Sequence, residues 1–132
     1  MNSTQRKALA ACSCDVRTDA LHRQLYATDA SIYQIEPEAV AIPRSPGEAA
    51  SVMRAASETG LAIIPRGAGT GLAGGAIGCG LVIDLSPHHR QITELNLEAR
   101  TVRVGPGVVL DQLNDFLQPH GYCFGPDVAT SS

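Results

Sequence analysis

The chain has 132 residues, 44% of them hydrophobic, and a formal net charge of −3, values typical of one globular domain with a modest core. The slightly negative charge excludes the basic footprint of a nucleic-acid-binding protein. No apolar stretch approaches the roughly 20 residues of a membrane span, and the first residues lack the apolar segment of a secretion signal. We therefore expect a cytoplasmic protein, with peripheral association with a membrane as the alternative.

The N-terminal part of the chain, residues 1–35, carries the weakest patterns. Residues 1–17 show no clear period, so we expect a frayed helix or disorder there. A short helix capped by Thr18 or Asp19 is predicted to follow. We divide the chain accordingly into this N-terminal segment, helical and partly disordered, and a domain over residues 36–132.

Neither the cysteines nor the histidines form a metal-binding pattern. The four cysteines, at positions 12, 14, 79 and 123, match no zinc, cluster or redox spacing, and we expect free thiols. His88, His89 and His120 lie in turn-like surroundings without a third ligand at helical spacing, so we expect them on the surface. The sequence therefore predicts no metal site.

A short apolar strand over residues 39–42 precedes the clearest local signal in the sequence. Ser45 can cap a helix, and Glu48 completes a capping box with it. The helix is predicted over residues 46–59, and a second apolar strand follows over 62–64. Strand, helix and strand in this order imply a parallel crossover.

A dense cluster of glycines follows the second strand, in the sequence IPRGAGTGLAGGA over residues 64–76. Glycine lets the main chain approach a ligand closely and point several N–H groups at it, which favours an anion such as a phosphate. Arg66 adds a positive charge at the start of the loop. A flexible linker is the alternative, but linkers are usually rich in Gly and Ser, whereas this loop carries Leu72 and Ala73.

Two known phosphate motifs fit this loop poorly. A Walker-type loop needs Gly-Lys followed by Ser or Thr, and the loop has no lysine. The dinucleotide fingerprint G-x-G-x-x-G matches at Gly69, Gly71 and Gly74, but it requires a helix to open at the loop, and the glycines up to Gly80 forbid one. We therefore expect a phosphate-binding loop of another type.

The second half of the chain is predicted to add strands and one helix. A third apolar strand covers residues 81–85, and we expect Asp84 to bond to the main chain as a strand-end residue rather than to act as a catalytic acid. Alternating residues up to 104 indicate a β-hairpin, and a helix is predicted over 108–117. We expect an α+β fold in which a βαβ crossover and flanking helices accompany one small mixed sheet, built by the strands near 39–42, 62–64, 81–85 and 101–104.

The glycine loop resembles the pyrophosphate loop of FAD-linked oxidases of the vanillyl-alcohol oxidase and p-cresol methylhydroxylase (PCMH) type. Three other segments resemble the D-lactate, glycolate and D-2-hydroxyglutarate dehydrogenase branch of that family: Tyr26-Ala-Thr-Asp29-Ala-Ser31-Ile-Tyr33, the stretch from Pro37 to Ser45, and Gly125-Pro126-Asp127-Val-Ala-Thr130-Ser131. The resemblance covers nearly the whole chain from Thr18 onward. It is more specific for the cofactor domain than for the substrate.

The resemblance implies a flavin-dependent oxidoreductase, an enzyme that acts on the CH–OH group of D-2-hydroxy acids such as lactate, glycolate or 2-hydroxyglutarate. In that family FAD lies between two lobes, and we expect this chain to be the first lobe of a PCMH-type FAD-binding domain, truncated. Relatives with covalent flavin often place histidine where Thr70 stands, so we expect non-covalent FAD. The electron acceptor is not indicated, and we expect an iron–sulfur cluster, if there is one, outside these residues.

The family's cofactor contacts carry over to two groups of positions. Those in the glycine loop are expected to contact the pyrophosphate or ribityl group: Arg66, Gly67, Ala68, Gly69, Thr70, Gly71, Gly74 and Gly75. Those in the closing segment are expected to begin a second flavin-contacting loop: Pro126, Asp127, Thr130 and Ser131. We assign no catalytic residue, because the base and the substrate clamp are expected in an absent portion, and the fragment alone is expected to be inactive.

Two other functions stay open. One is an FAD-dependent reductase of the cell-wall precursor type, although that group favours Gly-x-Gly-Ser-Asn where this loop has Thr70 and Gly71. The other is a small non-catalytic nucleotide-binding or interaction domain. A flavin spectrum separates the flavoproteins from this last alternative, and turnover of D-2-hydroxy acids separates the dehydrogenase from the reductase.

Overall fold

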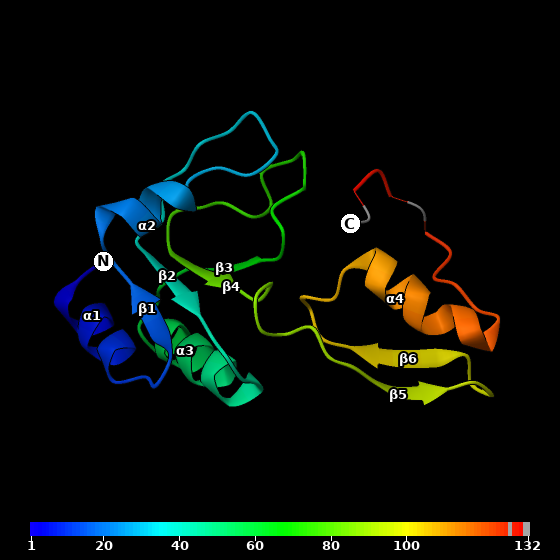
Figure 1. Ribbon diagram of the computed structural model, residues 1–132. Helices are drawn as coiled ribbons and strands as arrows, with labels where there is room; N and C mark the ends of the chain where they lie inside the picture. Colours follow the sequence, from blue (N-terminus) through cyan, green and yellow to red (C-terminus); the bar gives the residue numbers. More distant parts are fainter. Residues whose placement is uncertain (127, 131–132) are drawn as a thin grey trace.

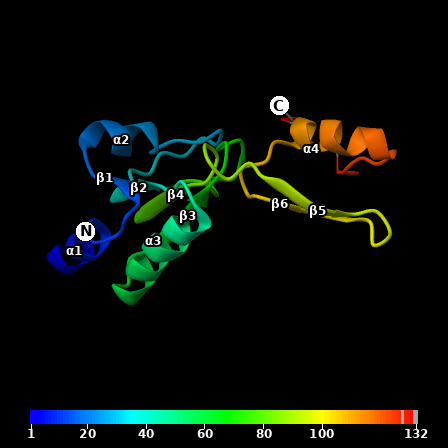
Figure 2. The same ribbon diagram turned by 60° about the horizontal axis from the view of Figure 1, so that its bottom comes forward.

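The computed structural model describes residues 1–126 and 128–130. Figures 1 and 2 show a main unit of helices around a sheet, and a hairpin with a helix that extends to one side of it. The elements follow in the order α1 (Ser3–Ala10), β1 (Asp15–Arg17), α2 (Ala20–Leu25), β2 (Ala39–Ile42), α3 (Pro46–Glu58), β3 (Ile63–Arg66), β4 (Leu81–Asp84), β5 (Ile92–Asn96), β6 (Thr101–Val104), α4 (Leu110–Leu117) and the 3₁₀ turn η1 (Gln118–His120).

Four strands form the main sheet in the order β1-β2-β4-β3. Both β2 and β3 run parallel to β4, and β1 adds an antiparallel edge beside β2. The crossover from β2 through α3 to β3 thus leaves a gap that β4 fills. The mixed sheet, the crossover and the flanking helices confirm the predicted fold class.

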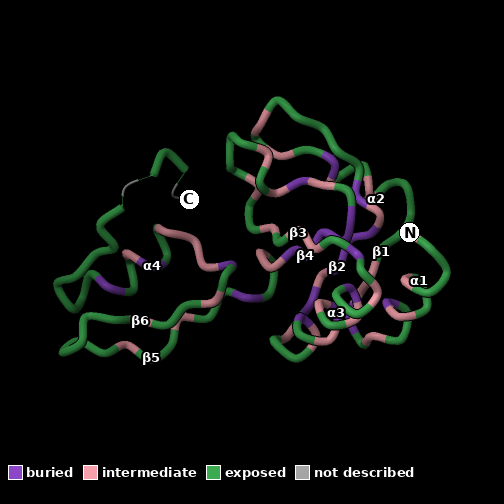
Figure 3. Tube along the Cα trace, turned by 180° about the vertical axis from the view of Figure 1, so that it is seen from behind, coloured by how far each residue is buried: buried purple, intermediate pink, exposed green. Residues whose placement is uncertain are grey.

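The core lies between this sheet and the helices α1 and α3, while α2 covers the opposite face (Figure 2). Leu81 and Ile83 of β4 pack in one cluster with Val52 of α3 and Leu9 of α1, all at most 1% exposed. Burying such a side chain contributes about 1.5–3 kcal/mol. Figure 3 shows that the buried residues gather in this unit, whereas the hairpin unit is mostly exposed.

Helix α3 begins as the sequence predicts. The Ser45 hydroxyl oxygen accepts the N–H of Glu48 at 3.2 Å, and Pro46 is the first helical residue. The Glu48 carboxylate accepts the N–H of Arg44, one residue before the cap, at 2.8 Å. Gly60 follows the helix in the left-handed conformation.

A helix forms within residues 1–17, as one of the two expectations had it, but the predicted fraying was wrong, because α1 is capped. Asn2 and Gln5 form a reciprocal capping box at the start of α1, with N···O distances of 2.9 and 2.8 Å. Asn and Gln here take the places that Ser or Thr and Glu occupy in the usual form of the box. The buried Leu9 then fixes α1 to the core, and β1 joins the sheet. Asp19 caps α2 as predicted, and the division of the chain at residue 35 stays a prediction.

The prediction that residues 101–104 share the main sheet was also wrong. β6 pairs with β5 in a separate two-stranded antiparallel sheet. A strand next to its partner along the chain closes a short loop at low entropic cost, whereas joining the distant sheet would require a longer closure. The expected hairpin therefore forms, but away from the main sheet.

A buried histidine joins the two units. His89 is 4% exposed, and its Nε2–H donates to the Pro43 carbonyl oxygen at 3.1 Å. Its own carbonyl oxygen accepts the N–H of Gly107 at 2.8 Å. The expectation that His89 lies on the surface was wrong, because the carbonyl group after β2 takes the imidazole as its donor, while His88 and His120 are exposed as expected.

A second buried group ties α2 to the end of β4. The Tyr26 hydroxyl donates to Asp84 Oδ2 at 2.6 Å. The other carboxylate oxygen, Asp84 Oδ1, accepts two hydrogen bonds from Ser86, one from its main-chain N–H at 2.9 Å and one from its hydroxyl at 2.7 Å. Asp84 is 6% exposed, and its bond to the main chain confirms the predicted strand-end role. Burial first, and then the bond to Asp84, raise the pKa of Tyr26 to about 12.

The four cysteines are free thiols, as expected, and burial raises the pKa of the Cys14 thiol to about 11. In the described part of the chain, no helix combines the length and the hydrophobicity needed to cross a bilayer.

Substitution of Gly105 by alanine should destabilise the junction between the two units. An added Cβ would collide with the His89 carbonyl oxygen, and such overpacking costs typically about 1–3 kcal/mol. Gly47→Ala in the first turn of α3 is the control, because its Cβ would meet no atom closer than 3.8 Å. Urea denaturation should show a clear loss of stability for Gly105→Ala only; equal stability of the two variants would contradict this packing.

Tyr26→Phe should lower the free energy of unfolding by about 1–3 kcal/mol at neutral pH, because Asp84 loses a buried donor. The pKa of Tyr26 is raised from 10.0 to about 12 in the folded chain, so its stabilising contribution is fully present below pH 10 and is lost as the pH rises through 12. The stability difference between wild type and Tyr26→Phe should therefore shrink over that range. Tyr33→Phe, at an exposed position, is the control; a difference that stayed constant up to pH 12 would contradict the assignment.

Candidate functional site

The glycine-rich loop, residues 67–80, leaves the carboxyl end of β3 and returns to the start of β4 (Figure 1). β3 and β4 are neighbouring parallel strands. Ligands of sheets with parallel strands bind beyond the carboxyl ends of the strands. The loop therefore lies where such a sheet offers a binding site.

The Arg66 side chain holds the loop from within. Its Nη1 donates to the carbonyl oxygens of Thr28, at 2.8 Å, and of Ala76, at 3.3 Å. Its Cζ lies 5.2 Å from the centre of the Tyr26 ring, within the range of a cation–π contact. Arg66 thus connects the beginning of the loop to a residue near its end and to the segment after α2.

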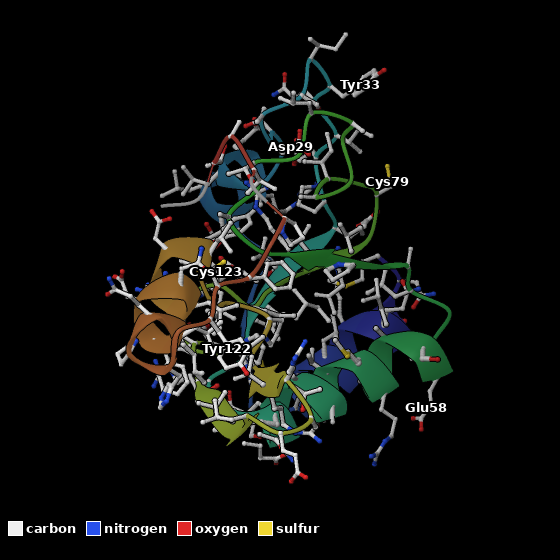
Figure 4. The ribbon with its side chains drawn as sticks, turned by 90° about the vertical axis from the view of Figure 1, so that its right-hand side faces the viewer. Asp29, Tyr33, Glu58, Cys79, Tyr122 and Cys123 are labelled. Atoms are coloured by element: carbon white, nitrogen blue, oxygen red, sulfur yellow. The ribbon has the colours of Figure 1, made fainter. Side chains whose placement is uncertain are left out.

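The segment over residues 27–35 braces the same loop. The Ala30 N–H donates to the Gly69 carbonyl oxygen at 2.9 Å, and the Ala76 N–H donates to Asp29 Oδ2 at 3.3 Å. Hydrogen bonds from Ser31, and then from Ala76, hold the pKa of the Asp29 carboxyl below its usual value. Figure 4 shows Tyr33 at the outer end of this segment and Asp29 nearer to the body of the chain.

Gly69 has a conformation that other residues avoid. Its φ is +72°, and an added Cβ would lie 2.7 Å from Arg66 Nη2. Both the left-handed backbone and the close approach of the guanidinium therefore require glycine. The position of Arg66 depends on this missing side chain.

The main chain of the loop forms a set of hydrogen-bond donors. Within the described residues, none of the hydrogen bonds is donated by an N–H of residues 67–75. These groups remain able to bind an acceptor from outside, and several adjacent N–H groups favour an anion. The donor set fits a phosphate group better than any apolar ligand.

A pocket of about 200 Å³ opens beside the loop. Three loop residues line it, together with Ser86, Arg90, the start of α4 and the turn before it: Gly67, Ala68, Thr70, Ser86, Arg90, Pro106, Gly107, Val108, Val109, Leu110 and Thr130. Ligand pockets commonly measure about 300–1,000 Å³. The pocket therefore suits part of a large cofactor, such as its diphosphate, rather than the whole of it.

The predicted cofactor contacts divide between this pocket and its surroundings. Gly67, Ala68, Thr70 and Thr130 line the pocket, while Arg66 and Gly69 support the loop behind it. Gly71, Gly74, Gly75 and Pro126 are outside the lining, and Asp127 and Ser131 lie outside the described residues. Their contacts with a cofactor stay predictions.

Sequence reasoning missed three contributors to the pocket. Ser86 and Arg90 follow β4, and the turn over residues 105–109 leads into α4. Nothing in the Gly105-Pro106-Gly107 sequence indicates that His89 fixes this turn beside the glycine loop. A second pocket, lined mostly by apolar residues including Leu95 and Tyr122, lies in the hairpin unit. Figure 4 labels Tyr122 and Cys123 of this lining.

Comparisons with known proteins show what this chain is similar to. A family model described as FAD binding domain matches residues 37–132. The D-2-hydroxyglutarate dehydrogenase of Pantoea ananatis is 44% identical over 121 residues, which cover 89% of this chain and 12% of that protein. The glycolate oxidase subunit GlcD of Bacillus subtilis is 37% identical over 108 residues, covering 80% of this chain and 23% of that protein.

The fold is also found among solved structures. Glucooligosaccharide oxidase from Acremonium strictum matches 96% of this chain and 27% of its own chain, with a TM-score of 0.74 and 17% identity. The chain spans only about an eighth of the length of the D-2-hydroxyglutarate dehydrogenase above. The family match and these relatives confirm the resemblance and its cofactor, FAD, at the level of the family: the chain belongs to the FAD-binding domains of the vanillyl-alcohol oxidase and p-cresol methylhydroxylase type.

Proposed function

We propose that this chain binds the diphosphate of FAD and forms the cofactor-holding part of a flavin-dependent dehydrogenase for D-2-hydroxy acids. The observation that carries the proposal is the 44% identity with a D-2-hydroxyglutarate dehydrogenase over 89% of the chain. Other relatives are a glycolate oxidase subunit and D-lactate dehydrogenases. D-2-Hydroxyglutarate is accordingly the first substrate to test.

The residues of this chain would bind and orient the cofactor. Flavin, when bound, supplies the acceptor for the hydride that leaves the hydroxyl-bearing carbon. The N–H groups of residues 67–71 offer donors to the diphosphate, and Arg66 keeps them in place. We propose these contacts together with those of Gly74, Gly75 and the segment from Pro126 to Ser131.

No described side chain is assigned to proton transfer or to the substrate carboxylate. Thr70 has no imidazole, so we propose that the flavin is held without a covalent bond. The electron acceptor stays open. A reducing compartment such as the cytoplasm is part of the proposal, supported by four free thiols, two of them exposed.

Titration of FAD into the ¹⁵N-labelled chain tests the proposal. We expect weak binding in fast exchange, with amide shifts concentrated at residues 67–71, because the diphosphate is the part of FAD that these residues contact. Riboflavin, which lacks the diphosphate, should leave these amides unchanged. Absence of shifts with FAD, or equal shifts with riboflavin, would favour the non-catalytic interaction domain over a flavin site.

The same FAD titration of the variant Gly69→Val tests whether the shape of the loop is required for binding. Its Cβ would strain the left-handed backbone and displace the Arg66 guanidinium, so FAD should no longer shift the loop amides. Gly47→Val in α3 is the control away from the site, since its added Cβ would meet no atom closer than 3.8 Å and its φ is not positive. Normal FAD shifts in Gly69→Val would refute the loop assignment.

The absence of an imidazole at Thr70 makes a separate prediction about attachment. After incubation with FAD and denaturation in acid, the chain should retain its unmodified mass, because no histidine lies in the loop. Intact-mass spectrometry measures this directly. An increase by the mass of FAD would show a covalent bond and contradict the proposal.

A further inference from the structure

The pocket beside the glycine loop contains one ionised side chain among its described lining residues, and it is Arg90. This arginine follows the turn after β4 and was not expected to contact a cofactor. Its Nε donates to the Ser86 carbonyl oxygen at 2.6 Å. That bond fixes the base of the guanidinium at the wall of the pocket.

Arg66, the arginine expected to meet the phosphate groups, is engaged elsewhere. Its Nη1 already donates to two carbonyl oxygens, and its Nη2 would be the first atom met by a Cβ at Gly69. It is not among the residues that line the pocket. Turning it toward a ligand would leave the carbonyl groups of Thr28 and Ala76 without this donor.

Arg90 has the free donors that Arg66 lacks. Apart from the bond of its Nε, no hydrogen bond joins its guanidinium to the described residues, and no described carboxylate lies within 4.0 Å of it. Its two Nη groups can therefore donate to an anion. A planar guanidinium matches two oxygens of one phosphate group, and such charge-assisted bonds are the stronger ones.

Charge adds to this geometry. The chain has a net charge of −3, so a diphosphate approaching it meets no general attraction. Arg90 is then the charged group of the described pocket lining that attracts the diphosphate directly. The N–H groups of the loop would position the diphosphate, while Arg90 would compensate its charge.

We propose that Arg90 is the charged ligand of the cofactor's diphosphate, and that Arg66 positions the loop without contacting it. This rests on the proposed function, because it assigns the cation of the same site. Substitution of the two arginines should therefore have different effects. Loss of Arg90 should weaken binding in a folded loop, whereas loss of Arg66 should disturb the loop itself.

The test is a titration of the ¹⁵N-labelled chain with inorganic pyrophosphate, followed by NMR. In the wild type, pyrophosphate should shift the amides of residues 67–71 and the Nε–H signal of Arg90. Arg90→Gln should raise the dissociation constant at least about tenfold, since a charge-assisted hydrogen bond contributes about 1.5–3 kcal/mol. Arg90→Lys keeps the charge but loses the planar guanidinium, so its dissociation constant should lie between those of the wild type and of Arg90→Gln.

Arg54→Gln is the matched control, because it removes the same charge from an exposed position on α3. Its dissociation constant should stay within twofold of the wild type. Arg66→Gln should alter the loop amides before any ligand is added, while Arg90→Gln should leave signals outside residues 86–92 unchanged.

The outcomes separate the inference from the proposed function. If the wild type binds pyrophosphate at the loop and Arg90→Gln binds equally well, the assignment of Arg90 is wrong and the diphosphate site stands. If Arg54→Gln weakens binding as much as Arg90→Gln, the effect is one of net charge and the assignment is again wrong. If neither FAD nor pyrophosphate shifts the loop of the wild type, the proposed function and the inference fail together.

Discussion

The bonds from the Arg66 guanidinium to the carbonyl oxygens of Thr28 and Ala76 determine the shape of the candidate site. The glycine loop has no strand partner and no helix to fix it, so side-chain hydrogen bonds must hold its shape. One side chain supplies donors to the loop and to the segment that braces it. Because Arg66 accomplishes this from behind the loop, the N–H groups of residues 67–75 stay available for a ligand. This position of Arg66 requires glycine at residue 69, since a Cβ there would collide with the guanidinium.

The pocket depends equally on how two separate units meet. The main sheet supplies the glycine loop at the end of β3 and, after β4, Ser86 and Arg90. The hairpin unit supplies the turn before α4. His89 joins the units by its buried bond to Pro43 and by its bond to Gly107. The site is therefore shared by residues that are more than 30 positions apart in the sequence, as Gly67 and Gly107 illustrate.

Local patterns predicted the parts of the fold that local interactions stabilise. Ser45, Pro46 and Gly60 bound α3, and the apolar runs give β2, β3 and β4. The glycine cluster likewise indicated the loop. Tertiary hydrogen bonds could not be predicted in this way: the burial of His89 depends on the Pro43 carbonyl group, and the separation of β6 from the main sheet depends on β5. The inward position of Arg66 has the same origin, since Thr28 is 38 residues away from it in sequence.

A crystal structure of the chain with ADP would test the central claim most directly, because ADP carries the diphosphate without the flavin. We predict that its phosphate oxygens lie within hydrogen-bonding distance, about 2.7–3.2 Å, of the N–H groups of residues 67–71, with Arg66 still bonded to the Thr28 carbonyl oxygen. A diphosphate bound instead by Arg66, with its bonds to Thr28 and Ala76 broken, would contradict the claim. So would ADP in the apolar pocket near Leu95 and Tyr122.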